Sequence, residues 1–79
     1  MKICVNISLK DGVLDPQAKA IEKALHALNF SEVREVKMAK QIILELDTQD
    51  LSEAKAQAKK MCEELLVNSV IENYEFKNL

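Results

Sequence analysis

The sequence has few of the residues that catalytic loops, tight turns and metal sites usually require. Among its 79 residues there is one glycine, one proline, one histidine and three aromatic side chains. A phosphate-binding loop needs several glycines, which Gly12 alone does not supply. One histidine and two distant cysteines do not meet the ligand number and spacing of a zinc site. We therefore expect no catalytic residue, no metal site and no cofactor site in this chain.

The chain also lacks an excess of positive charge and any long apolar run. Eleven Lys and Arg against thirteen Asp and Glu give a net charge of −2, so no basic field favours a nucleic acid partner. No apolar run approaches the ~20 residues of a membrane span. Residues 1–6 run directly into a strand pattern without the apolar stretch of a signal peptide, and we expect a cytoplasmic protein.

The length predicts one domain over residues 1–79. A chain of this size buries only about 60 % of the surface that its unfolded form exposes. The composition is 48 % hydrophobic and 30 % charged, which is typical of a folded globular domain. Such a small core favours self-association or a partner chain.

Apolar periodicity predicts a strand followed by a helix. Ile3, Val5, Ile7 and Leu9 alternate with more polar residues. A helix is expected from Asp15, whose carboxylate caps backbone N–H groups, and it is expected to end near residue 29 with Phe30 returning toward the core. Its apolar stripe comprises Ala18, Ile21, Leu25 and Leu28.

The second half of the chain predicts a hairpin, a helix and a last strand. Residues 33–38 and 41–47 are both rich in β-formers, and we expect a turn at Ala39-Lys40 to join them. Asp50 with Glu53 three residues later has the spacing of a capping box, so a second helix is expected to about Val67. Residues 70–77 then read as the final strand.

The element order βαββαβ predicts an α+β, ferredoxin-like two-layer sandwich, with an antiparallel sheet and both helices on one face. The other sheet face would then be uncovered. Its expected occupants are Cys4, Asn6, Ser8, Ile43 and Ile71. An uncovered face of this kind is commonly covered by a partner chain, so we expect a homodimer or a higher homo-oligomer.

Two runs, in this order and at this separation, closely resemble the PurS family, the small subunit of phosphoribosylformylglycinamidine synthase. The first run is Lys10-Asp11-Gly12-Val13-Leu14-Asp15-Pro16-Gln17, and the second comprises Met61-Cys62-Glu63, Leu65-Leu66, Asn68, Val70-Ile71-Glu72 and Tyr74; Val33, Val36 and Lys40 lie between them. The resemblance covers essentially the whole chain. Ala18 and Ala39 stand where the family often has Gly, and Ser69 where it often has Pro.

The resemblance implies a role in de novo purine biosynthesis. PurS-like chains are non-catalytic subunits of a glutamine- and ATP-dependent carbon–nitrogen ligase that converts formylglycinamide ribonucleotide to its amidine. They dimerise and bridge a large PurL-like synthetase subunit and a PurQ-like glutaminase subunit, so that ammonia can pass between them. ATP and Mg²⁺ are then expected on the large subunit and not on this chain.

Short loops held by a rigid sheet are where binding residues concentrate. We therefore expect partner contacts at the loop that contains Lys10, Asp11, Gly12 and Asp15, and at the turn that contains Lys40. The alternative interpretation is a ferredoxin-like regulatory dimer that senses a small molecule at its interface. An acylphosphatase-like hydrolase is disfavoured, because Arg34 is the only arginine and lies in no evident anion-binding loop.

Overall fold

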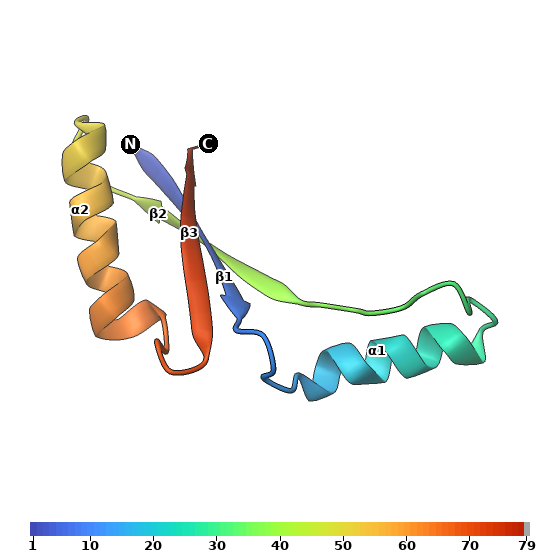
Figure 1. Ribbon diagram of the computed structural model, residues 1–79. Coiled ribbons are helices and arrows are strands. Elements are labelled where there is room, and N and C mark those ends of the chain that lie inside the picture. The colour runs from blue at the N-terminus through green and yellow to red at the C-terminus, as the bar shows by residue number, and fades with distance from the viewer. Residues whose placement is uncertain (79) are drawn as a thin grey trace.

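The computed structural model describes residues 1–78 as an antiparallel sheet with two helices (Figure 1). The elements in chain order are β1 (Lys2–Leu9), α1 (Pro16–Ala27), β2 (Ala39–Glu45), α2 (Leu51–Met61), the π-helical turn η1 (Cys62–Leu66) and β3 (Glu72–Asn78). The described sheet has three strands in the order β2-β1-β3, and both pairings are antiparallel. The predicted α+β class, with an antiparallel sheet and two helices, is confirmed.

Both helices begin where their capping residues predict. The Asp15 carboxylate accepts hydrogen bonds from the backbone N–H groups of Gln17 and Ala18, at 3.0 and 3.2 Å. Asp50 accepts one from Ser52 at 3.0 Å. The predicted capping box is only half formed, because the N–H of Asp50 donates to Thr48 Oγ1, while the Glu53 carboxylate accepts from Thr48 Oγ1 and Gln57. Asn29 follows α1 with φ of 70°, the left-handed conformation that ends helices. These local signals act within a few residues, and for this reason the sequence alone predicts them.

The core lies between one face of the sheet and α2. Ile3, Val5 and Ile7 of β1 pack against Ala54 and Ala58 of α2, all essentially inaccessible to solvent. The two alanines lie one helical turn apart, and their small side chains let α2 approach the strand closely. Half-buried side chains surround this centre; they are Met1, Ile42, Leu44, Leu46, Leu66, Val67, Tyr74 and Phe76.

The structure differs from the expected βαββαβ order at residues 33–38. This segment forms no strand pairing within the described chain, and Ala39 and Lys40 begin β2 instead of forming a turn. The physical reason is visible in the spacing of the apolar residues. Val36 and Met38 have the same parity as Ile42 and Leu44, so the segment continues β2 in one direction and no glycine turn is required.

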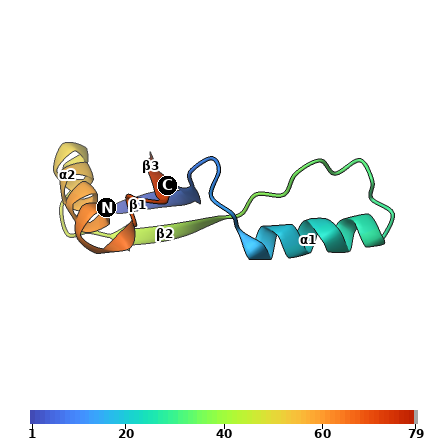
Figure 2. The same ribbon diagram turned by 60° about the horizontal axis from the view of Figure 1, so that its bottom comes forward.

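The second difference is the position of α1. Figures 1 and 2 both show α1 and the segment that follows it to β2 (residues 28–38, the return segment) extending away from the sheet. Among residues 1–78 only α2 packs substantially on the sheet. The radius of gyration is 16.1 Å, against about 12 Å for a compact chain of this length. Phe30 does not return to the core and is 48 % exposed. Two helices on one face are thus not achieved within one chain.

The face of the sheet opposite α2 is open and mostly polar. Cys4 and Ile43 lie opposite each other there, and Ile43 is 53 % exposed. The neighbouring pairs on this face are Asn6 with Gln41 and Asn6 with Glu75. Ile71 precedes β3 and lies outside the sheet, contrary to expectation. The open face therefore carries less apolar surface than the sequence pattern predicts.

Candidate functional site

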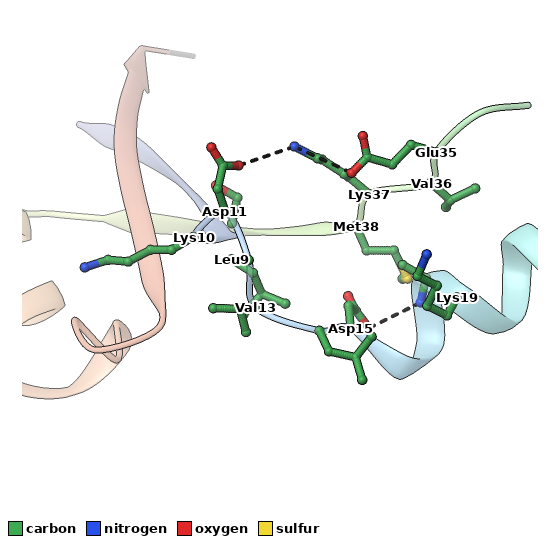
Figure 3. Close-up of a pocket in the computed structure, with 14 residues that line it drawn as sticks. Leu9, Lys10, Asp11, Val13, Asp15, Lys19, Glu35, Val36, Lys37 and Met38 are labelled. Atoms are coloured by element: carbon green, nitrogen blue, oxygen red, sulfur yellow. Dashed lines mark hydrogen bonds and ion pairs between the residues drawn. The ribbon is translucent and has the colours of Figure 1, made fainter.

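A cleft of about 160 Å³ lies where α1 joins the sheet (Figure 3). Four of the five predicted contact residues line it: Lys10, Asp11, Gly12 and Asp15. The opposite wall comes from residues 35–38 of the return segment, which approach the loop from a distant part of the sequence. The structure thus brings most of the predicted contact residues to one place.

The loop that forms the cleft is held by its backbone. The N–H of Lys10 donates to the carbonyl of Ile71 at 2.8 Å, which ties the loop to the residue before β3. The N–H of Val13 donates to the carbonyl of Lys10 at 3.2 Å and closes a turn. Gly12 has φ of 85° in that turn, a conformation that glycine adopts without steric cost. The loop therefore presents its charged side chains from a defined backbone.

Lys37 and Glu35 complete the cleft, and the sequence pattern did not single them out. The Lys37 amine lies 3.6 Å from Asp11 Oδ1 and 3.9 Å from Glu35 Oε1 (Figure 3). All three side chains are well exposed, so these ion pairs contribute at most about 1 kcal/mol each. Glu35 and Lys37 alternate with Val36 and Met38 on an extended segment, and this alternation was the sequence signal that they lie on one side of it.

Lys40, the fifth predicted contact residue, lies outside this cleft. Its amine is 3.5 Å from Glu72 Oε2, and the Glu72 side chain is only 15 % exposed. Glu72 also accepts a hydrogen bond from the N–H of Asn68 at 2.8 Å. Lys40 and Glu72 belong to β2 and β3, on either side of β1, so this pair links the two outer strands at one end of the sheet.

The return segment is attached to α1 by the chain's single histidine. His26 Nε2 lies 2.7 Å from the carbonyl oxygen of Val33, a hydrogen-bonding distance in which the ring N–H donates. This contact and the ion pair between Lys37 and Asp11 join the loop, α1 and the return segment into one unit. We call residues 10–38 the arm.

Among the described residues 1–78, Cys62 has a clearly shifted thiol pKa. It lies at the start of η1 with no solvent exposure, and burial, followed by the carboxylate of Glu63, raises the pKa of its thiol. A raised pKa keeps the thiol protonated and a weak nucleophile at neutral pH. Cys62 is therefore a packing residue of the core.

This shift predicts a pH dependence of stability. Unfolding returns the thiol pKa to its ordinary value of about 8.5. Because the folded pKa is the higher one, the stabilising effect is complete below about pH 8.5 and is lost as pH rises through the folded pKa. We expect the free energy of unfolding, measured by urea denaturation, to fall above this pH in the wild type and to fall less steeply in Cys62→Ala. Equal slopes for the two proteins would contradict the prediction.

The charged side chains of the described residues are suited to binding through surface contacts. Over residues 1–78, no three His, Cys, Asp or Glu side chains are placed to hold a metal ion. Nor is any helix within that range both long enough and apolar enough to cross a membrane. The cleft instead presents positively charged amines and negatively charged carboxylates around a loop with a defined backbone.

Fold and site together define a small α+β module with one packed helix, one detached arm and a charged cleft at the base of the arm. A family model described as "PurS: Phosphoribosylformylglycinamidine (FGAM) synthase" matches residues 2–79. The chain belongs to the PurS family. The resemblance inferred from the sequence is confirmed.

Individual relatives agree with the family match over nearly their full length. The phosphoribosylformylglycinamidine synthase subunit PurS of Bacillus subtilis is 41 % identical over 76 residues, which are 96 % of this chain and 89 % of the relative. The crystal structure of Methanocaldococcus jannaschii PurS superposes with a TM-score of 0.86 at 39 % identity, covering 96 % of this chain and 92 % of that one. A chain in the structure of PurLQS from Thermotoga maritima has a TM-score of 0.88 at 35 % identity, with 99 % and 95 % coverage.

Proposed function

We propose that this chain is the accessory subunit of a phosphoribosylformylglycinamidine synthase, which it serves by bridging the ATP-dependent synthetase subunit and the glutaminase subunit. The observation that carries the proposal is the full-length likeness to a chain of the Thermotoga maritima PurLQS assembly. In this role the chain supports ammonia transfer during conversion of formylglycinamide ribonucleotide to formylglycinamidine ribonucleotide. The small-molecule-sensing alternative is not favoured by these matches.

The chain acts through its surface and contributes no catalytic group. ATP and Mg²⁺ bind on the large subunit, and the complex works in the cytoplasm. The support from the residues is that the charged cleft is built from solvated amines and carboxylates on a loop, an arrangement suited to contact with another protein.

The bridging role is tested by reconstitution from the purified synthetase and glutaminase subunits. Omitting this chain should abolish glutamine-dependent formation of the amidine, whereas turnover with added ammonium salt should continue, because the synthetase then needs no ammonia from the glutaminase. Adding the chain back should restore the glutamine reaction. If glutamine-dependent turnover is the same with and without the chain, the bridging role is wrong.

The loop and Lys40 are the proposed partner contacts within that role. Reversal of Lys10 to Glu should weaken capture of the two partner subunits by roughly tenfold, which corresponds to ~1.4 kcal/mol. Lys40→Glu alone would also lose the internal pair with Glu72. The exchange Lys40→Glu with Glu72→Lys restores that pair and still reverses the charge at position 40, but it removes the Glu72 acceptor of the Asn68 N–H. Its stability is therefore measured beside its partner binding.

The measurement is a pull-down with the two partner subunits, alongside thermal unfolding of each variant. We expect Lys10→Glu to unfold near the wild-type temperature, the exchanged protein to unfold at a lower temperature because it lacks the hydrogen bond from Asn68 to Glu72, and both proteins to bind partners more weakly. If both variants capture the partners as the wild type does, the loop and Lys40 are not the contact surface, although the bridging role can still hold through other residues.

Self-association accompanies this function in our proposal. The open sheet face, at first the expected dimer surface, is mostly polar. The arm instead carries exposed apolar side chains, among them Ile21, Leu28 at 66 % exposure and Phe30. Exposed apolar surface of this extent on a small chain favours a homodimer formed through the arm.

A further inference from the structure

The two most exposed large apolar side chains of the described residues lie five positions apart, at one end of the sheet. Leu65 is 84 % exposed and Val70 is 80 % exposed. Figure 1 shows the segment that carries them, η1 and the turn before β3 (orange), at the end of the sheet where β1 leads into the arm. Scattered exposed apolar residues are ordinary, but these two are held outward by special backbone structure.

The π-helical turn leaves Leu65 in solvent. The N–H of Val67 donates to the carbonyl of Cys62 at 3.0 Å, five residues back instead of the four of an α-helix. Of the three apolar residues in a row at this point, Leu66 and Val67 pack against the core and Leu65 does not. π-helical turns are rare and frequently occur at functional positions.

Val70 lies in a turn that hydrogen bonds hold closed. The carbonyl of Asn68 accepts from the N–H groups of Ile71 and Glu72, at 3.1 and 2.8 Å. The side-chain oxygen of Asn68 accepts from the N–H of Val70 at 3.1 Å. An asparagine bonded to the backbone two residues further on is a common means of fixing a turn. Val70 is therefore presented to solvent by a defined backbone.

We propose that Leu65 and Val70 are apolar anchors for the partner subunit that also contacts the loop at Lys10. The N–H of Lys10 donates to the carbonyl of Ile71, so the loop and the turn are joined directly beside Val70. Figure 3 shows the Lys10 side chain pointing away from Asp11, toward β3. One protein surface can thus reach the Lys10 amine and Val70 together. This inference deepens the proposed accessory role and rests on it.

The charges beside the two anchors define the chemistry of the partner. Glu63 and Glu64 immediately precede Leu65 and are exposed, whereas the amine of Lys10 lies on the side of Val70. The complementary surface is an apolar pocket with lysine or arginine side chains facing η1 and a carboxylate facing Lys10. In such a contact the buried apolar anchors supply most of the affinity, and the charges at the rim guide association.

Removal of both anchors provides the first test. The chain with Leu65→Ser and Val70→Ser is immobilised and titrated with purified synthetase subunit and purified glutaminase subunit, singly and together. We expect the Kd for one subunit to rise at least about tenfold, and Lys10→Glu to weaken binding of that same subunit. Ile43→Ser, an equally apolar exposed position on the open sheet face, is the control and should bind as the wild type does.

Stability and oligomeric state are measured on the same variants. Because both anchors are almost fully exposed, the double serine variant should unfold near the wild-type temperature. Light scattering should give the same mass for this variant and the wild type. A lower mass for the variant would assign the anchors to contact between copies of the chain and would overturn the proposal.

Charge reversal beside Leu65 provides the second test. Glu64→Lys should weaken binding of the same subunit several-fold at low salt and by less than about twofold at high salt, because salt screens exposed charges. The loss in the double serine variant should persist at both salt concentrations, since apolar burial is not screened. Glu75→Lys on the open sheet face makes the same change in net charge and should have no effect.

The outcomes separate this inference from the bridging role. Wild-type affinity of the double serine variant for both subunits would overturn the inference. A Lys10→Glu variant that binds the affected subunit normally would also overturn it, because loop and anchors would then serve different partners. Neither result bears on the bridging role. If reconstitution shows glutamine-dependent turnover without this chain, the bridging role and the inference fail together.

Discussion

If the chain forms the proposed homodimer through its arm, Ile21→Asp should convert it into monomers at micromolar concentration. Ile21 lies on the apolar stripe of α1 and is 38 % exposed within the described chain, whereas Ala18 at the start of the stripe is buried. In a symmetric dimer each substitution occurs twice. If each Asp removes buried apolar contact worth about 2 kcal/mol of the free energy of dimerisation, the dimer dissociation constant rises by roughly 10³-fold. Sedimentation equilibrium over a range of concentrations measures this change.

The matched control for this prediction is Lys23→Ala on the exposed polar side of the same helix. It should leave the dissociation constant within about twofold of the wild-type value. The Ile21→Asp monomer should keep β1, β2, β3 and α2 folded, because their core does not include α1. If Ile21→Asp is still dimeric at micromolar concentration, the stripe of α1 is not part of the interface.

Ile3→Ala should destabilise the protein more than any substitution on the arm. Ile3 is fully buried between β1 and α2, in contact with a core that includes Ala54 and Ala58. Removal of buried methyl groups loses transfer free energy and leaves a cavity, and such changes cost about 2–5 kcal/mol. For a domain of this size the midpoint of thermal unfolding should fall by at least about 10 °C. Urea denaturation gives the free energy directly.

Ile43→Ala is the control, because it removes the same methyl groups from the open face of the same sheet. Ile43 is already half exposed, so we expect a loss below about 1 kcal/mol. Both variants and the wild type are compared at one chain concentration, since stability coupled to dimerisation depends on concentration. Equal losses for the two variants would mean that the open face is covered in solution and the packing described here is incomplete.

Local structure was predictable from the sequence because its causes are local. The caps at Asp15 and Asp50 and the helix end at Asn29 depend on contacts within a few residues, and all three are confirmed. The alternation in β1 depends on which face of the strand meets the core, and the buried residues Ile3, Val5 and Ile7 follow it. The family was also predictable, since its two sequence runs are present in order.

The candidate site was predictable only in part. Four of its five predicted residues lie in one short loop, so chain connectivity alone brings them together. Lys37 and Glu35 reach the same cleft from more than twenty residues away, because the return segment runs back along α1. Lys40 was placed with the loop on the expectation of a hairpin, and it lies instead beside Glu72 at the end of the sheet.

By itself, the sequence determined the caps, the α+β class, the buried stripe of β1 and membership of the PurS family. Only the tertiary structure decided that residues 33–38 continue β2 and that α1 leaves the sheet. The physical reason is that alternation shows which side of a strand is apolar but does not show which neighbouring strand it pairs with. A two-residue turn at Ala39-Lys40 would place Met38 opposite Gln41, whereas a straight extension keeps Met38 on the face of Ile42. The backbone pairing of Ala39 and Lys40 with β1 shows the straight extension.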